Sequence, residues 1–141
     1  ITVGVIGNET PTILPILEIE YNATITNTYE HKMLDHEIIH CPADFSPAEE
    51  KRIKDTAHNI YKVLNARDFG RIDMIVAPDG TPFFLEINTF AGLTMSTGKA
   101  HSGYMGYMAE AEGLSAPEFI GAIVRYAIER CKVREAHALP S

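Results

Sequence analysis

A stretch at residues 70–89, GRIDMIVAPDGTPFFLEINT, constrains the fold of this chain more than any other. Two runs of β-branched, aromatic and aliphatic residues flank Asp79-Gly80, a dipeptide favoured in two-residue hairpin loops. Both central positions of a type I′ turn need positive φ, which Gly and Asp tolerate. The pattern therefore predicts a β-hairpin in which Asp79 and Gly80 form the loop and Pro78 pairs with Thr81.

The register of this hairpin decides which side chains meet. Counting back from the predicted loop, Asp73 pairs with Glu86 and Arg71 pairs with Asn88. Strand side chains alternate between two faces, so all four groups share one face. Two opposed carboxylates, with Cβ atoms roughly 5 Å apart, repel each other unless a cation lies between them. Mg²⁺ takes carboxylate oxygens together with substrate phosphates, and an amide carbonyl is also acceptable, so the pattern indicates a metal site for phosphoryl transfer.

Two alternatives remain open from the spacing alone. The polar residues could lie on the solvated face of an ordinary exposed hairpin, where Arg71 only neutralises Asp73. A three-residue loop with a bulge would also shift the register and separate Asp73 from Glu86.

The remaining patterns predict three further strands, two capped helices and two loops. Apolar runs predict strands at 1–7, 16–21 and 37–41, and the Pro-containing segment 8–15 reads as a loop. A serine and a proline at the start, followed by an acidic residue and an apolar stripe, predict helices at 46–64 and 116–132. A Gly/Ser/Thr-rich loop is expected at 90–103, a length typical of functional or disordered loops.

Size and charge limit the class of protein. The 141 residues, 45% of them hydrophobic, are enough for one domain with one core. Net charge is -7, from 12 Lys and Arg against 19 Asp and Glu, which argues against a nucleic-acid partner. No long apolar segment predicts a membrane span, and two distant cysteines favour a reducing, cytoplasmic setting. The chain opens directly on the apolar strand ITVGVIG without Met, so we expect residues 1–141 to be a piece of a longer protein.

Several motifs together resemble the C-terminal part of the D-alanine D-alanine ligase family, within the ATP-grasp superfamily. The motifs are GRIDMIVAPDG followed by FFLEINT and AGLT, ITVGVIGN at the start, CPAD before the first predicted helix, and EGLSAPEFI at the last one. The resemblance covers nearly the whole chain. It implies an α+β fold, with an antiparallel sheet backed by helices, that forms the C-terminal lobe of the ATP clamp.

The same resemblance implies roles for the hairpin residues. Asp73, Glu86 and Asn88 match the Mg²⁺ ligands of the family, with Glu86 bridging two ions and Mn²⁺ as a substitute metal. Arg71 matches the arginine that stabilises the transition state, and Gly92 matches the glycine whose backbone N–H joins it in an oxyanion hole. The implied reaction passes the γ-phosphate of ATP to the carboxylate of one D-alanine, and the amine of a second amino acid then attacks the acyl phosphate, which makes a building block for peptidoglycan.

Three further residues match nucleotide or substrate contacts of the family. Leu85 would line the nucleotide pocket, Lys32 would approach the phosphates, and Thr97 would meet the carboxylate of the second substrate. Beyond Met95 the sequence STGKAHSGY departs from the family pattern, so the second substrate stays open. The substrate domain, the nucleotide lysine and the adenine-side glutamates of the family are absent from these residues, so the expected partner is an N-terminal part of the same protein. A homodimer also stays open.

Two other function classes compete with the ligase. HEIIH at 36–40 matches the H-E-x-x-H pattern, which on a helix would bind Zn²⁺ through two histidines. Pro42 and the paired isoleucines favour a strand instead, which would hold the histidines roughly 13 Å apart, too far to share a metal. The other alternative is a non-catalytic ATP-grasp remnant that serves as a binding or assembly module.

Overall fold

One antiparallel sheet organises the molecule, and its strand order is β3-β2-β1-β4-β5. The structure, a computed structural model, describes residues 1–21, 37–96 and 102–138. The strands are β1 (Thr2–Ile6), β2 (Thr12–Tyr21), β3 (Glu37–His40), β4 (Phe69–Val76) and β5 (Pro82–Asn88), and the helices are α1 (Pro47–Val63), α2 (Tyr104–Ala111) and α3 (Ala116–Ala138). This arrangement confirms the predicted α+β class.

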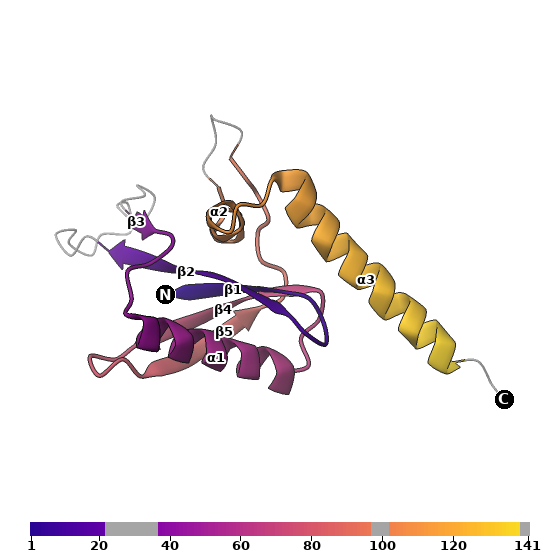
Figure 1. The fold of residues 1–141 in the computed structure, drawn as a ribbon, viewed down its shortest axis with the longest axis horizontal. Helices are drawn as coiled ribbons and strands as arrows, with labels where there is room; N and C mark the ends of the chain where they lie inside the picture. Colours follow the sequence, from indigo (N-terminus) through magenta and orange to yellow (C-terminus); the bar gives the residue numbers. More distant parts are fainter. Residues whose placement is uncertain (22–36, 97–101, 139–141) are drawn as a thin grey trace, which may run out of the picture.

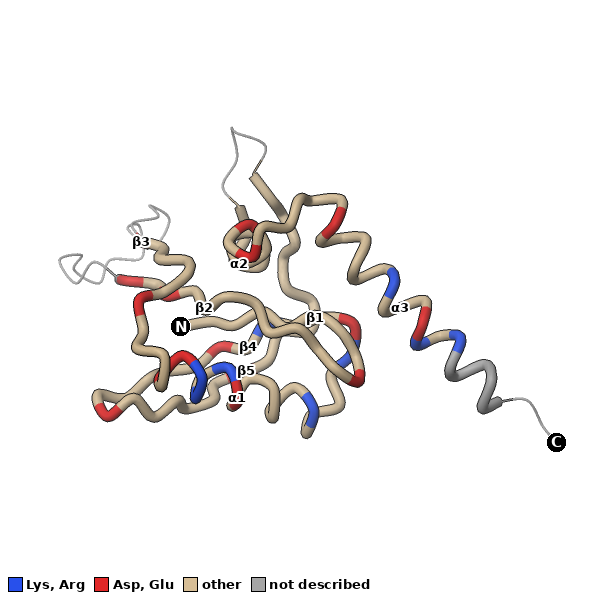
Figure 2. The backbone as a smooth tube through the Cα atoms, in the orientation of Figure 1, with Lys and Arg blue, Asp and Glu red and all other residues tan. Residues whose placement is uncertain are grey.

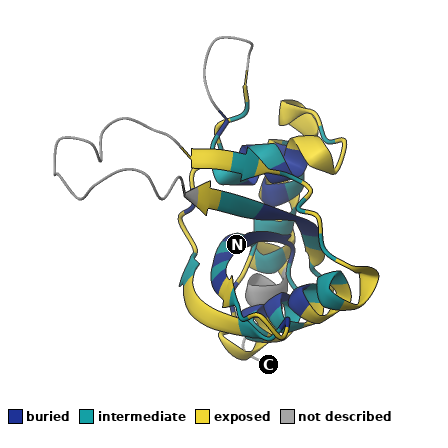
Figure 3. Cartoon of the chain, turned by 90° about the vertical axis from the view of Figure 1, so that its left-hand side faces the viewer, coloured by how far each residue is buried: buried dark blue, intermediate teal, exposed yellow. Residues whose placement is uncertain are grey.

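Helices lie on both faces of the sheet. Helix α1 packs along one face, α2 packs against β1 and β2 on the other, and α3 runs obliquely away from the sheet towards the C-terminus (Figure 1). All five residues of the central strand β1 are buried, and Figure 3 shows this buried layer between helices. The sheet therefore separates two apolar cores.

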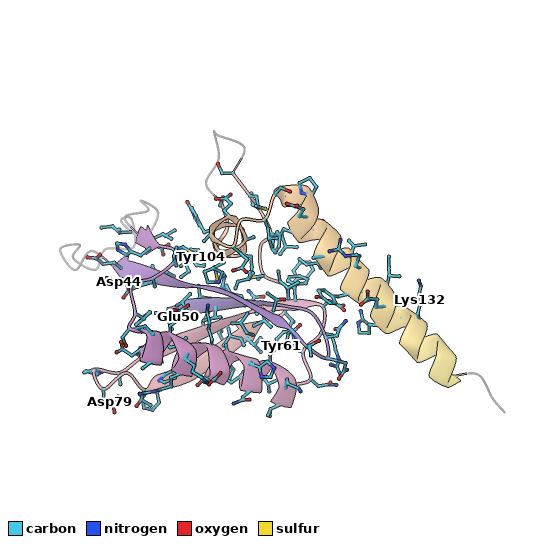
Figure 4. All side chains as sticks on the ribbon, viewed as in Figure 1. Asp44, Glu50, Tyr61, Asp79, Tyr104 and Lys132 are labelled. Carbon is cyan, nitrogen blue, oxygen red and sulfur yellow. The ribbon has the colours of Figure 1, made fainter. Side chains whose placement is uncertain are left out.

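The first core lies between α1 and the sheet. Helix α1 begins at the predicted place, because Ser46 and Glu49 form a reciprocal capping box ahead of it. Tyr61 of α1, labelled in Figure 4, is fully buried, and its hydroxyl donates to the carbonyl of Gly7 at 2.9 Å. The core contains Val3, Val5, Ile16, Ile53, Ala57, Tyr61, Ala66, Ile72 and Met74.

The second core lies between the sheet, α2 and the start of α3. A Cβ on Gly4 of β1 would lie 2.8 Å from Leu14 of β2 and 3.0 Å from the sulfur of Met105 of α2. The missing side chain of Gly4 therefore leaves room for the ends of these two side chains. The core contains Ile6, Leu14, Leu17, Ala91, Met105, Met108, Ala109, Phe119 and Ile123.

Strand β2 begins earlier than predicted. Residues 8–15 were expected to be a loop broken by proline, yet β2 starts at Thr12 and Pro15 lies within it. The pairing of β1 with β2 is irregular between Val3 and Val5, which face Ile16 and Ile13. Proline cannot donate to a strand ladder and is tolerated where the pairing is interrupted by a bulge, which explains its place here.

Two helices differ from the sequence predictions. Helix α2 was not predicted, because it has only two turns and contains Gly106. Helix α3 extends to Ala138, beyond the predicted end at Lys132. The predicted strand at 37–41 is confirmed as β3, so Glu37–His40 is extended and the helical H-E-x-x-H zinc site is wrong. His36 lies outside the described residues.

Charges are interspersed along the described helices. Both acidic and basic residues occur along α1 and along the described part of α3 (Figure 2). Two ion pairs at four-residue spacing stabilise α1, namely Lys51 with Asp55 and Lys54 with Glu50. In the described part of the chain, no helix is both long and apolar enough to cross a membrane.

Candidate active site

The hairpin of β4 and β5 brings the four polar residues into register as predicted. Arg71 pairs with Asn88, and Asp73 pairs with Glu86. Strand β1 lies on the other side of β4, where Thr2 pairs with Asp73. Because paired residues project to the same side of a sheet, these groups share the face that α2 covers.

The loop of the hairpin differs from the prediction. Ala77 donates to Thr81 at 2.9 Å, and Gly80 donates to Ala77 at 2.8 Å, so three residues separate the paired positions. Gly80 has φ +77°, and it is the residue in this loop that adopts positive φ. The predicted two-residue Asp79-Gly80 turn is therefore wrong, and so is the pairing of Pro78 with Thr81. Asp79 instead accepts a hydrogen bond from the Thr81 amide at 2.9 Å.

A bulge on β5 compensates for the longer loop. Met74 pairs with Phe84, whereas Asp73 pairs with Glu86, so Leu85 is the extra residue on β5. The loop shifts the register by one residue and the bulge shifts it back by one. As a result, Asp73 faces Glu86 although the turn was assigned incorrectly. Leu85, the predicted nucleotide-pocket residue, lies at the bulge and is 55% exposed.

Arg71 and Asp73 form a two-point ion pair. The Arg71 Nε lies 2.9 Å from Asp73 Oδ1, and Nη2 lies 2.7 Å from Oδ2. The Thr2 hydroxyl also donates to Asp73 Oδ1 at 2.6 Å. The two charged side chains are only 18% and 21% exposed, so water screens them less than an ordinary surface pair.

These contacts keep the Asp73 carboxyl and the Arg71 guanidinium ionised. Burial alone would raise the pKa of the Asp73 carboxyl, but hydrogen bonds from Arg71 and Thr2, with the charge of Arg71, outweigh burial and lower that pKa. The hydrogen bond to Asp73 raises the pKa of the Arg71 guanidinium. Asp73 is therefore an anion at neutral pH, as a metal ligand must be.

The residue types fit a hard divalent cation. Two opposed carboxylates and the amide oxygen of Asn88 are all oxygen donors, the kind that Mg²⁺ prefers. Glu86 is exposed on the edge strand, whereas Asn88 Oδ1 accepts a hydrogen bond from the Phe90 amide at 2.9 Å. Among the described residues, no three His, Cys, Asp or Glu side chains cluster closely enough to hold a metal. An ion here would need ligands beyond the carboxylate pair.

The other predicted site residues fall into two groups. Gly92 lies in the loop after β5, where a Cβ would meet nothing within 4 Å, so its backbone is sterically open. The carbonyl of Gly92 lies beside Gly103, ahead of α2. Lys32 and Thr97 lie outside the described residues.

Sequence reasoning missed Thr2 and Tyr104. The Arg71 guanidinium carbon lies 5.2 Å from the centre of the Tyr104 ring. The signal for Thr2 was a hydroxyl in an otherwise apolar strand. For Tyr104 no local signal existed, because its contact with Arg71 depends on where α2 packs.

A cavity at the surface of the described residues does not coincide with this site. It has a volume of about 570 Å³ and lies between the β1–β2 connection, the α1–β4 connection and α3. It is lined by Asn8, Glu9, Thr10, Asn65, Arg67, Tyr126, Glu129 and Arg130. The ordered polar constellation on β4 and β5, not this cavity, is the stronger candidate site.

Comparisons with known proteins show the family to which the chain is similar. The family model described as "D-ala D-ala ligase C-terminus" matches residues 1–125. A D-alanine–D-alanine ligase of Pelotomaculum thermopropionicum is 33% identical over 140 residues, covering 95% of this chain and 40% of the relative. The chain thus spans about two fifths of the length of that curated relative.

Solved structures resemble the chain as well. The VanG D-Ala:D-Ser ligase of Enterococcus faecalis has a TM-score of 0.69 at 27% identity, over 89% of this chain and 35% of that one. A D-alanine–D-alanine ligase from Coxiella burnetii has a TM-score of 0.75 at 23% identity, over 96% of this chain and 33% of that one. The second likeness is evidence of shared fold only.

Proposed function

The chain belongs to the D-ala D-ala ligase C-terminus family, and from that premise we propose that it carries the metal-binding half of an ATP- and Mg²⁺-dependent carboxylate–amine ligase. The reaction proceeds through an acyl phosphate and joins D-alanine to a second amino acid, in the cytoplasm, for peptidoglycan. The observation that carries the proposal is the pairing of Asp73 with Glu86 beside an ordered Arg71, within a sheet of the family fold.

Asp73, Glu86 and Asn88 are the proposed metal ligands. Glu86 is the exposed member and would bridge two ions, while the ionised Asp73 holds its place through Arg71 and Thr2. Bound Mg²⁺, or Mn²⁺ in its place, would spread the charge of the ATP phosphates during transfer. Because Asp73 and Glu86 are the two carboxylates of this proposed set, substrate phosphates and water would complete it.

Arg71 and Gly92 are the proposed oxyanion donors. Asp73 occupies the Nε and Nη2 groups of Arg71, and within the described residues no protein acceptor is paired with Nη1. That group could donate to the negative oxygen that develops on the attacked carbonyl. A donor already fixed in place stabilises developing charge without reorganising first, which is the main electrostatic contribution in such sites. The open backbone at Gly92 would supply the second donor.

The remaining contacts belong to the nucleotide and the second substrate. Leu85 would line the nucleotide pocket, where the bulge leaves it exposed. Lys32 would approach the phosphates, and Thr97 the carboxylate of the second amino acid. We take D-alanine as that amino acid, although one structural relative is named for D-serine as its second substrate.

Part of the same proposal is that these 141 residues act together with a further region of one longer ligase. That region would supply the nucleotide lysine and the pocket for the first D-alanine. The isolated chain would then fold but would not catalyse ligation, because it would supply only one side of the ATP-binding site.

The test is to incubate the longer ligase with ATP, Mg²⁺ and D-alanine, follow phosphate release, and identify the dipeptide by mass spectrometry. We expect turnover on the order of 1 per second or faster, lost in Asp73→Asn. Absence of turnover in the unsubstituted ligase would favour a non-catalytic binding module. Turnover at that rate by the isolated chain would contradict the half-site proposal.

A further inference from the structure

Arg71 is held from two directions. Asp73 binds its Nε and Nη2 groups at 2.9 and 2.7 Å within the sheet. The ring of Tyr104, the first residue of α2, lies against the guanidinium, with 5.2 Å between the guanidinium carbon and the ring centre. A guanidinium this close to an aromatic face is attracted by the electron-rich ring, and more strongly when both are partly buried.

Tyr104 is itself fixed at its far end. Its hydroxyl donates to Glu37 Oε2 at 2.6 Å, so the ring spans the space between β3 and Arg71. Figure 4 labels Tyr104 beside α2, on the side near the sheet. The contact links three parts of the chain that are distant in sequence.

The backbone that carries Tyr104 has little freedom to move. Met105 and Met108 are fully buried, and Met108 Sδ accepts a hydrogen bond from the Gly4 amide at 3.1 Å. Just ahead of α2, the Gly103 amide donates to the Thr94 carbonyl at 2.9 Å. Helix α2 is therefore anchored directly above β1, next to the strand that bears Arg71.

We propose that Tyr104 is a positioning residue for the ligase reaction, because its ring holds the Arg71 guanidinium in the orientation that stabilises the transition state. This inference rests on the proposed function, since Tyr104 acts only through Arg71. A free arginine side chain samples many rotamers, and holding it in one orientation costs conformational entropy. The ion pair with Asp73 and the Tyr104 ring together remove that freedom before the substrate arrives, so the donor is preorganised.

The first experiment compares two tyrosines of the same helix in the longer ligase. Tyr104 and Tyr107 are both half-buried and both pack against the second core, so Tyr107→Leu is a matched control for Tyr104→Leu. We expect Tyr104→Leu to lower kcat roughly tenfold with little change in the KM for ATP. Tyr107→Leu should leave kcat within about twofold of the parent. Equal losses of kcat in the two variants would overturn the inference.

A double-mutant cycle separates positioning from packing. In an Arg71→Lys background the stacked guanidinium is gone, so adding Tyr104→Leu should lower kcat by less than about twofold. A further tenfold loss in that background would show that Tyr104 acts independently of Arg71 and would overturn the inference while the proposed function stands. Unchanged kcat in Arg71→Lys alone would overturn both.

A spectroscopic measurement does not depend on catalysis or on Tyr104→Leu being well folded. The Nε–H signal of Arg71 can be assigned by its loss in Arg71→Lys, using arginine labelled with ¹⁵N. Because an aromatic ring shifts the signals of protons near its face, Tyr104→Leu should move this signal and Tyr107→Leu should not. Tyr104→Phe keeps the ring, loses the bond to Glu37 and should cause an intermediate shift. An Arg71 signal that is the same in parent, Tyr104→Leu and Tyr104→Phe would rule out the contact.

Discussion

The two faces of the β4–β5 hairpin differ in chemistry. Towards α1, Ile72 and Met74 are 0% and 1% exposed, and Ile72 pairs with Ile87 in the first core. Towards α2, the intervening residues Arg71 and Asp73 form an ion pair and face Asn88 and Glu86. One pair of strands thus serves the core on one side and the candidate site on the other.

This difference between the two faces indicates which residues the fold requires. The apolar face is stabilised by burial, which is roughly proportional to the area removed from water. The polar face gains little net stability. The free energy that partly buried charges lose in hydration is about as large as the free energy they gain from mutual attraction. Residues one position apart should therefore separate cleanly into those whose loss unfolds the protein and those whose loss stops the reaction.

The largest effect is expected on the polar face, from Glu86→Gln in the longer ligase. Removing one of two opposed charges relieves repulsion in the hairpin but removes a proposed metal ligand. We expect turnover to fall by about a hundredfold to a thousandfold, comparable with the loss of a key electrostatic group, while unfolding free energy changes by less than about 1 kcal/mol. Phosphate release at saturating Mg²⁺ and urea denaturation measure the two quantities.

A matched control for Glu86→Gln is Glu112→Gln, because Glu112 is also exposed and caps α2 away from the hairpin. It should leave turnover unchanged. If Glu86→Gln matched the parent in turnover at saturating Mg²⁺, the polar face would have no metal role. The proposed functional difference between the two faces would then be wrong.

On the apolar face, Ile72→Ala should lower the unfolding free energy by about 2–4 kcal/mol, since it leaves a cavity in the first core. Ile75 lies in the same strand but is 57% exposed, so Ile75→Ala should cost less than about 1 kcal/mol. Turnover per folded ligase molecule should survive both changes. Denaturation curves measure the unfolding free energies of the two variants, and activity assays below the unfolding transition measure their turnover. A selective loss of activity in folded Ile72→Ala would mean that the two faces are coupled.

Local chemistry explains what could be predicted from the sequence. The capping box at Ser46 and Glu49 lies within four residues, so the start of α1 followed directly from the sequence. The alternation of Arg71, Ile72 and Asp73 likewise assigned each residue to a face, because strand geometry fixes a period of two. These features depend on neighbours along the chain.

The hairpin register shows why a correct result can come from incomplete reasoning. The sequence predicted a two-residue loop and no bulge, and the structure has a three-residue loop and a bulge at Leu85. The two errors cancel at Asp73 and Glu86. A bulge is set by how the strand packs against the rest of the sheet, and nothing in FFLEINT marks Leu85 as the extra residue.

Long-range packing explains the features that could not be predicted from the sequence. The strand position of Pro15 depends on the irregular pairing with β1, and the helical state of α2 depends on burial of Met105 and Met108. The stack of Tyr104 on Arg71 joins residues from α2 and β4. Neither partner carries a local pattern that predicts the other.

The packing of α2 against the loop that follows β5 can be tested at Gly106. A Cβ there would lie 2.1 Å from the Thr94 carbonyl oxygen, a clash with backbone that cannot rotate away. Gly106→Ala should therefore lower the unfolding free energy by about 1–3 kcal/mol. Gly121, also helical, has open space except for Arg125 at 3.4 Å, so Gly121→Ala should be neutral or stabilising by up to about 1 kcal/mol. Equal unfolding free energies for the two variants would contradict this close approach.

The smallest expected effect is the contribution of the Asp73 charge to stability, measured as a function of pH. The pKa of Asp73 is lower in the folded state than in an unfolded chain, where it is about 3.9. As pH falls, the unfolded state takes up the proton first, so the stabilisation is complete above the unfolded pKa and is lost as pH falls through the folded pKa. Asp73→Asn cannot titrate.

The quantity to measure is the unfolding free energy of the parent minus that of Asp73→Asn, from urea denaturation at each pH. We expect this difference to be constant near neutrality and to fall by about 1–2 kcal/mol below about pH 4, the size of a charged hydrogen bond. Asp55→Asn removes an exposed ion pair with Lys51 and should show a smaller change. A difference for Asp73→Asn that is flat across the acid range would mean that Arg71 and Thr2 do not hold this carboxylate in solution, and the polar face would then lack the fixed anion on which its proposed chemistry depends.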